Sequence, residues 1–322
     1  MTEDVEAPLF LRKYKVPFHA LSYVFGENAL KWFRREPSIG RNSLVGTTIR
    51  STDDLPQHLL ADEKHTWIKG EKAYIATTVA NHCILGVSVA KKADEPELTN
   101  AYGVFKAQTR KLQPDYAPQP VTTDGWAATQ NAWKTLFSSP LLILCFWPVF
   151  LQIRDWAKKP FKDSFAQIAE QLWNGFRAPH KRTFSQRIRR RLEWSSIHPI
   201  PSIISAKLET RREKSTFFTR ASDFPAAPRT TRMVDRLMPR MDKHLFSVQY
   251  FHGSHQTAEL SIRSWALIQN WAPSNPYTIN QFNGWPSPAE RLSQFRYHDN
   301  WWQNLLVSAS QRQYSGYPPN PL

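Results

Sequence analysis

The chain has 322 residues, enough for one large domain or two medium-sized domains with a proper hydrophobic core. It carries 42 Lys and Arg against 27 Asp and Glu, a formal net charge of +15, and 13% of its residues are aromatic. That aromatic content excludes a disordered basic tail, and the positive charge is typical of a protein that binds a polyanion.

Both cysteines, Cys83 and Cys145, lie in apolar runs. Two thiols are too few for a zinc site, and we interpret them as buried thiols of a reducing compartment. The N-terminus shows no signal-peptide pattern, and the most apolar run, Pro140–Leu151, is shorter than the roughly 20 residues that span a bilayer. The sequence therefore predicts a soluble, intracellular protein.

Residues 1–58 form a basic and aromatic segment. Apolar residues at helical spacing predict a helix over His19–Arg35, and the basic loop Gly40–Gly46 follows it. Two interpretations remain open for this segment: the helix and loop contact DNA, or the segment is an appendage that packs on the rest of the protein.

The stretch Leu59–Lys92 contains three runs rich in Val, Ile, Thr and Tyr. Turn residues at Lys69-Gly70 and at Asn81-His82 bound the second and third runs, Ala73–Val79 and Cys83–Ala90. This pattern predicts a three-stranded antiparallel meander.

Alternating helices and strands follow the meander. A helix over Glu97–Leu112 precedes a Pro-rich loop, and a short strand over Val121–Asp124 leads into a second helix that carries Trp126. Leu141–Phe146 is an apolar run of strand length, typical of a strand buried on both faces. The order β-β-β-α-β-α-β predicts an α/β (α+β) fold of the ribonuclease-H-like type, with a mixed five-stranded sheet and flanking helices.

Between residues 154 and 214 the periodicity is helical, and the segment holds fifteen basic residues and six acidic ones. We interpret this block as an all-helical insertion within the fold. A charge run is often a solvated helix face, but this excess has one sign and favours phosphate contact. The candidate DNA-binding residues are Lys181, Arg182, Arg187, Arg189, Arg190 and Arg191.

Two further helices are predicted over Thr231–Phe246 and Thr257–Gln269, followed by a loop over Ala272–Pro288 and a short helix within Ala289–Ser308. The chain thus divides into four segments. These are an N-terminal helical segment (1–58), the first part of the core (59–153), the basic helical insertion (154–228) and the return of the core (229–322).

Carboxylates at the strand ends suggest metal chemistry. In a ribonuclease-H-like sheet, a carboxylate on the first strand and one at the end of the fourth lie on neighbouring strands, and Asp62 and Asp124 occupy those places. A bare carboxylate is costly on a half-buried sheet, which favours a metal ligand, although Asp62 could instead simply end its strand. A third carboxylate would come from Asp235, Glu259 or Glu63, and side-chain alternation directs Glu63 to the opposite face.

The chain resembles the DDE transposases of bacterial and archaeal insertion sequences, which share their core with retroviral integrases. The resemblance covers nearly the whole chain. The stretches that carry it are Leu59–His65, Val121–Ala128, Ile143–Phe146 with Ile153–Asp155, Met233–Met238, and Ser287–Leu292 with Phe295–Asn300.

The resemblance implies a DNA transposase that cleaves the ends of its element and joins them to target DNA. It implies that Asp62 and Asp124 are metal ligands, with Asp235 preferred over Glu259 as the third, and that two Mg²⁺ or Mn²⁺ ions are the cofactors. The implied partners are double-stranded DNA, as element ends and target, and further copies of the chain as a dimer or larger assembly. No membrane is implied, and the implied location is the cytoplasm of a prokaryote, at the nucleoid.

Several positions depart from the pattern of these transposases. Trp147-Pro148 stands where relatives carry a His, and Pro228 stands at a second such position. Arg232 replaces an Asn three residues before the third acid. Pro239 removes the N–H that would bond the carbonyl of Asp235, at an expected cost of roughly 3 kcal/mol and a kink. These departures leave open a decayed, catalytically inactive DNA-binding copy.

Two other readings account for fewer features. A ribonuclease that acts on RNA–DNA hybrids would share the core, but it leaves the basic insertion and the C-terminal resemblance unexplained. A membrane-surface protein would need an exposed apolar stripe beside the basic helices, and the sequence has none there.

Overall fold

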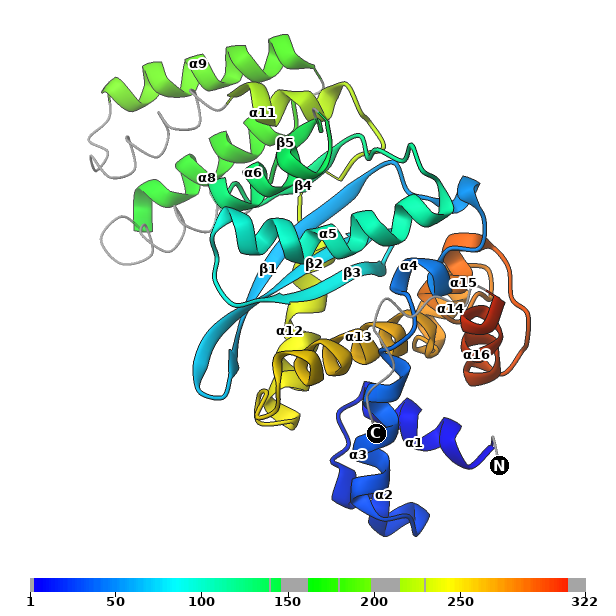
Figure 1. Ribbon diagram of the computed structural model, residues 1–322. Helices are drawn as coiled ribbons and strands as arrows, with labels where there is room; N and C mark the ends of the chain where they lie inside the picture. The colour runs from blue at the N-terminus through cyan, green and yellow to red at the C-terminus, as the bar shows by residue number, and fades with distance from the viewer. Residues whose placement is uncertain are drawn as a thin grey trace.

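The computed structural model describes residues 3–138, 140–145, 162–178, 180–197, 215–228 and 230–311. Its centre is a five-stranded mixed sheet with the strand order β3-β2-β1-β4-β5 and helices on both faces (Figure 1). The strands are β1 (Leu59–Ile68), β2 (Glu71–Ala80), β3 (Cys83–Ala90), β4 (Val121–Thr123) and β5 (Leu142–Leu144).

Strands β1 to β3 form the predicted antiparallel meander, and β4 and β5 run parallel to β1. Two-residue turns join the first three strands. Lys69 and Gly70 both have positive φ (50° and 82°), and so do Asn81 and His82 (47° and 67°). This conformation matches the right-handed twist of the strands that such turns connect. The predicted mixed five-stranded sheet is confirmed, and its order is compatible with a ribonuclease-H-like arrangement.

Each face of the sheet has its own hydrophobic core. Helices α5 (Glu95–Leu112) and α6 (Ala127–Leu136) cover one face, where Leu59 and Ala61 of β1 point. Helices α12 (Arg232–Ser247) and α13 (His255–Trp271) cover the other face, together with Leu60. Successive residues of β1 thus alternate between the two cores, as the period of a strand requires.

The N-terminal segment differs from its prediction. The single helix expected over His19–Arg35 is two helices, α2 (Phe18–Phe25) and α3 (Ala29–Ile39), because Gly26 adopts the left-handed conformation (φ 70°) and ends α2. A further helix, α1 (Glu3–Lys13), precedes them. The short helix α4 (Leu44–Thr48) and a 3₁₀ turn (Thr52–Asp54) lead into the sheet.

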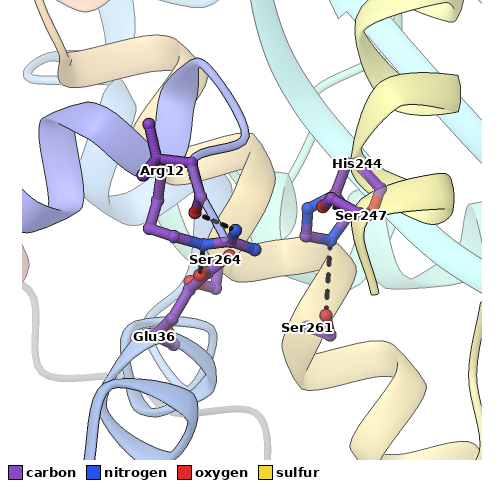
Figure 2. A network of polar contacts seen from close by, with 7 residues as sticks. Arg12, Glu36, His244, Ser247, Ser261 and Ser264 are labelled. Carbon is purple, nitrogen blue, oxygen red and sulfur yellow. Dashed lines mark hydrogen bonds and ion pairs between the residues drawn. The ribbon is translucent and has the colours of Figure 1, made fainter. Parts of the chain in front are cut away.

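A buried polar network fixes these N-terminal helices to the core (Figure 2). Arg12 donates from Nε to Glu36 Oε2 at 2.5 Å, and both side chains are almost inaccessible to solvent. Ser264 of α13 donates to the carbonyl oxygen of Glu36. The end of α3 also lies so close to α13 that a Cβ on Gly40 would stand 2.1 Å from the carbonyl oxygen of Leu260. This segment therefore packs on the return of the core.

The described part of the insertion is helical, as predicted. It comprises α8 (Lys162–Phe176), α9 (Lys181–Ile197), α11 (Ser215–Thr219) and a 3₁₀ turn (Arg220–Ser222). Figure 1 shows α8, α9 and α11 beyond β5, at the end of the molecule opposite the N-terminal helices.

The C-terminal region holds more helix than predicted. Helix α14 (Pro276–Gln281) lies within the expected loop, because Asn275 caps its start and Pro276 fits its first turn. The single helix expected near the end is two, α15 (Pro288–Ser293) and α16 (Trp301–Gln311). None of the helices that the structure describes is long and apolar enough to cross a membrane.

Candidate functional site

Asp62 lies on β1, and Asp124 directly follows the end of the neighbouring parallel strand β4. The register of β1 with β4 pairs Leu59 with Val121 and Leu60 with Thr122. Carried two residues further, the same register sets Asp62 beside Asp124, which directly follows the last residue of β4. Neighbouring strands are about 4.8 Å apart, so the two carboxylates face the same small region of space.

Asp235 reaches this region from the first turn of α12, which lies across β1 (Figure 1). Three contacts place the start of this helix. The Thr231 N–H donates to Cys145 Sγ at 3.1 Å, just after β5, and Thr122 Oγ1 donates to the Pro228 carbonyl oxygen at 2.9 Å. About two turns further along α12, Asp242 forms an ion pair with Lys64 of β1 at 2.7 Å.

Each of the three carboxylates has only local hydrogen-bond partners. Asp62 Oδ1 accepts from the Glu63 N–H at 2.8 Å, and Asp124 Oδ1 accepts from the Trp126 N–H at 2.9 Å. Asp235 accepts from the hydroxyl of Thr231 at 3.3 Å. Within the described residues no Lys, Arg or His forms an ion pair with any of the three. Among the described residues, their remaining oxygen lone pairs have no partner and are available to a cation.

Burial and like charge act together on Asp62. Burial raises the pKa of its carboxyl group to about 8, with further contributions from the negative charges of Asp124, Glu63 and Asp235. Burial also raises the pKa of Asp235, which the hydrogen bond from Thr231 partly offsets. The charges of both other carboxylates therefore act on Asp62, and no cation from the described residues forms an ion pair with any of the three.

Glu63 lies on the opposite face of the sheet, as side-chain alternation predicts. Its Oε1 accepts from the hydroxyls of Tyr102 on α5 and Thr129 on α6, both at 2.6 Å. Burial raises its pKa to about 7, and the two hydrogen bonds oppose that shift. Glu63 thus anchors β1 to the helices behind it.

Glu259, the alternative third carboxylate, is not brought to the site. It lies on α13 against the outer strand β3, where Ser88 Oγ donates to it at 2.6 Å and the Val89 N–H donates at 2.5 Å. Strand β2 separates β3 from β1. Of Asp235 and Glu259, Asp235 is the one whose negative charge contributes to the raised pKa of Asp62.

The donor set suits a hard divalent cation. Mg²⁺ prefers carboxylate oxygens, retains several waters, and is held by one or two carboxylates together with substrate phosphates. In the described ranges, no three His, Cys, Asp or Glu side chains already form a group that could hold a metal ion. The level pair Asp62 and Asp124 fits an ion that is recruited together with phosphate, with Asp235 supplying the additional carboxylate.

Pro239 lies inside α12, and the helix continues through it to Ser247 rather than ending early. The carbonyl of Asp235 lacks its usual intrahelical partner there, because proline has no N–H.

The other departures from the transposase pattern lie elsewhere. The carbonyl oxygen of Pro228 accepts the hydrogen bond from Thr122 and so helps to hold the start of α12. Arg232 is the first residue of α12. Trp147 and Pro148 lie outside the described residues.

The basic residues of α9 divide into two groups. Lys181, Arg182, Arg189 and Arg190 are exposed; Lys181 pairs with Asp223 at 2.5 Å and Arg189 pairs with Glu193 at 2.9 Å. Arg187 is half-buried and donates to the carbonyl oxygen of Asn174.

Arg191 is a correction to the predicted set of DNA-binding residues, because its side chain is only 3% exposed. It follows Phe184 and Ile188 at helical spacing, so it falls on the face of α9 that packs inward. Burial lowers the pKa of this arginine to about 10. Arg191 is therefore not presented to a polyanion in this structure.

The residues that position α12 could not be recognised from the sequence. Cys145 was assigned only as a buried thiol, yet its sulfur accepts the Thr231 N–H and contacts the Thr231 hydroxyl at 3.2 Å. The signal for this contact was weak: a polarisable residue at the end of an apolar strand and a Thr before a helix. Neither residue type marks such a contact by itself.

No protein-family model matches the chain, and none of the curated proteins compared with it gives a match.

Proposed function

We propose that the protein is a DNA transposase that cleaves the ends of a mobile element and transfers them to target DNA. The observation that supports this proposal is that Asp62 lies on β1, Asp124 directly follows β4, and Asp235 lies in the first turn of α12, which contacts β1. Extending the register of β1 and β4 by two residues sets Asp62 beside Asp124, and the pKa of Asp62 responds to both Asp124 and Asp235. The sequence resemblance supports the same assignment.

Two divalent ions, when bound about 3.5–4 Å apart, would supply activation of the attacking oxygen and charge stabilisation at the leaving oxygen. Asp62 and Asp124 would hold these ions from the sheet, and Asp235 would hold them from α12. The contacts of Thr231 with Cys145 and of Thr122 with Pro228 keep α12 in place over the strand ends. A misplacement of even about 1 Å at such a site costs much of the rate.

DNA would lie along the insertion helices. The exposed positive side chains of α9 would contact phosphates and position DNA without reading its sequence. They are Lys181, Arg182, Arg189 and Arg190. Surface ion pairs such as Arg189–Glu193 contribute little free energy and exchange readily for phosphate. Because two element ends must be paired, we propose a homodimer or larger assembly on DNA.

A catalytically inactive DNA-binding remnant is the alternative, and Pro239 is the observation that favours it. This proline sits one turn after Asp235 in the helix that must position this carboxylate. An inactive copy with the same fold would still bind DNA through α9, and it would inhibit an active relative by occupying element ends.

The test is divalent-ion-dependent cleavage and strand transfer on supercoiled DNA that carries the sequence flanking the protein's own gene. Four proteins are compared: the native chain, Asp62→Asn, Asp124→Asn, and Asp242→Asn. The last removes the same charge from α12 outside the site. We expect cleavage by the native chain and by Asp242→Asn with Mg²⁺ or Mn²⁺, and background cleavage by the other two.

DNA binding by the native chain without cleavage would establish the inactive remnant. Cleavage that survives both Asp62→Asn and Asp124→Asn would contradict the proposed function, because it would place the chemistry elsewhere.

A further inference from the structure

A cavity of about 600 Å³ lies on the other side of α12 from the sheet site. The end of α1, helix α14 and the start of α15 close it. Its lining contains no acidic side chain among the described residues, and the cationic side chains that reach it are Lys13, Lys15, Arg236, Arg240, Lys243 and Arg291. Asp235 is not part of this lining, so the cavity is distinct from the carboxylate site.

Two of these cations are held in place by backbone carbonyls. Lys13 Nζ donates to the carbonyl oxygens of Ala272 and Pro273, both at 2.6 Å. Arg291 donates to the carbonyl oxygens of Trp285 and Pro286 at 3.2 and 3.3 Å. Neither residue forms an ion pair within the described part of the chain, and burial lowers the pKa of both.

Gln269 of α13 provides an independent sign of a ligand site. Its side chain lines the cavity and is 4% exposed, yet neither its amide nitrogen nor its amide oxygen has a hydrogen-bond partner in the described structure. Leaving a buried polar group unpaired costs about 1–3 kcal/mol, so such a group normally has a partner. A ligand with polar atoms in the cavity would supply it.

The cations act on the same volume. Burial lowers the pKa of Lys13 to about 7, and the positive charges of Arg240 and Arg291 contribute to the same shift. The pKa of His82, which also lines the cavity, is lowered by burial and then by Arg291, Arg236 and Arg240. Positive potential from three elements therefore converges where an anion would be most strongly attracted.

We propose that this cavity binds the phosphate groups of a nucleotide, with Arg236, Arg240 and Arg291 around the phosphates and Gln269 hydrogen-bonded to them. Arginine guanidinium groups match phosphate oxygens in two-pronged hydrogen bonds. The cavity volume is that of a small-ligand site. Tyr14 in the lining is 58% exposed and supplies a ring face on which a base can stack.

The nucleotide has two possible sources, a free nucleoside triphosphate or the end of a nucleic-acid strand. Both present the same phosphates to the same cations. The site rests on none of the proposed metal ligands, so it stands whether or not the protein is a transposase.

The test is calorimetric titration of the full chain, without divalent ions, with tripolyphosphate, ATP and a 5′-phosphorylated single-stranded oligonucleotide. The cavity variants are Arg240→Gln, at an exposed position, and Gln269→Met, which keeps the side-chain volume and removes the unpaired amide. Lys91→Gln, at an exposed position after β3, makes the same charge change as Arg240→Gln at a residue with no proposed role in binding. We expect binding that each cavity variant weakens about tenfold and that Lys91→Gln leaves unchanged.

Tighter binding of ATP than of the oligonucleotide would support the proposal with the free nucleotide as the source, and the reverse order would support it with a strand end. The proposal is overturned if none of the three probes binds. It is equally overturned if Lys91→Gln weakens binding as much as Arg240→Gln, because net charge alone would then explain the binding.

Discussion

Asp62 experiences two unfavourable effects at once, removal from water and the nearness of other carboxylates. Its pKa rises from 3.8 to about 8, mainly through burial and next through Asp124. The folded protein therefore binds a proton that the unfolded chain releases. The free energy of unfolding must fall as the pH rises from about 4 to about 8, where Asp62 ionises in the folded state.

Asp62→Asn should stabilise the metal-free protein, because an uncharged amide of the same shape avoids this penalty. We expect a gain of about 2 kcal/mol at pH 8 and little gain at pH 4, a value reduced from the full shift because the side chain keeps some contact with water. Urea denaturation with a chelator present measures it. Asp242→Asn, which loses an ion pair with Lys64, should show no such gain. An equal effect of Asp62→Asn at both pH values would contradict the account.

Helix α12 is the element that joins the site to the rest of the fold. Its first turn carries Asp235, and its middle contains Pro239. Because proline cannot donate to the carbonyl four residues earlier, the helix is weakest beside the carboxylate that it presents.

Pro239→Ala should raise the free energy of unfolding by about 2 kcal/mol, because alanine restores the hydrogen bond to Asp235 and is the best helix former. Urea denaturation again supplies the measurement. Pro276→Ala is the matched control, since Pro276 stands in the first turn of α14 where no hydrogen bond is lost, and it should change stability little. A Pro239→Ala protein no more stable than the native chain would show that the proline does not weaken α12.

The elements that could be predicted are those whose sequence signals are local. The turn residues Lys69-Gly70 and Asn81-His82 predicted the meander, and apolar residues at helical spacing predicted α5, α12 and α13. The division of the expected N-terminal helix depends on the backbone conformation of one glycine, Gly26, which apolar spacing does not report. The register that sets Asp62 beside Asp124 could be expected from the order of strands, whereas the contact of Thr231 with Cys145 depends on tertiary packing.

Across the whole molecule, the basic residues behind the net charge of +15 have different environments: some are buried and others are exposed. Arg12 and Arg191 are buried, six cations converge on the cavity beside α12, and others stand in the open on α9. The charge run at Arg187–Arg191 was predicted as one DNA-binding unit. The run does not act as one unit, because its residues are helical and their side chains point in different directions, so that only some of them point to solvent.

Replacing Arg189 and Arg190 together with Gln should weaken DNA binding and make it less sensitive to salt. Each phosphate that is no longer neutralised lowers the slope of log affinity against log salt by about 0.9, so the double variant should lower it by about 1.8. Fluorescence anisotropy over a salt series measures the slope. The control, Lys91→Gln with Lys92→Gln, removes the same charge from an exposed turn after β3. An equal decrease of slope in the control would assign the effect to net charge.

The central claim is that Asp62, Asp124 and Asp235 together hold divalent cations. Electron paramagnetic resonance of Mn²⁺ titrated into the protein with a short oligonucleotide present measures this binding without requiring cleavage, because the site is expected to recruit its ions together with phosphate; the oligonucleotide alone gives the background. We predict binding that Asp62→Asn and Asp124→Asn each weaken about tenfold or more, that Asp235→Asn also weakens, and that Asp242→Asn leaves unchanged. Mn²⁺ binding that is the same in all five proteins, or absent from the native chain, would contradict the claim.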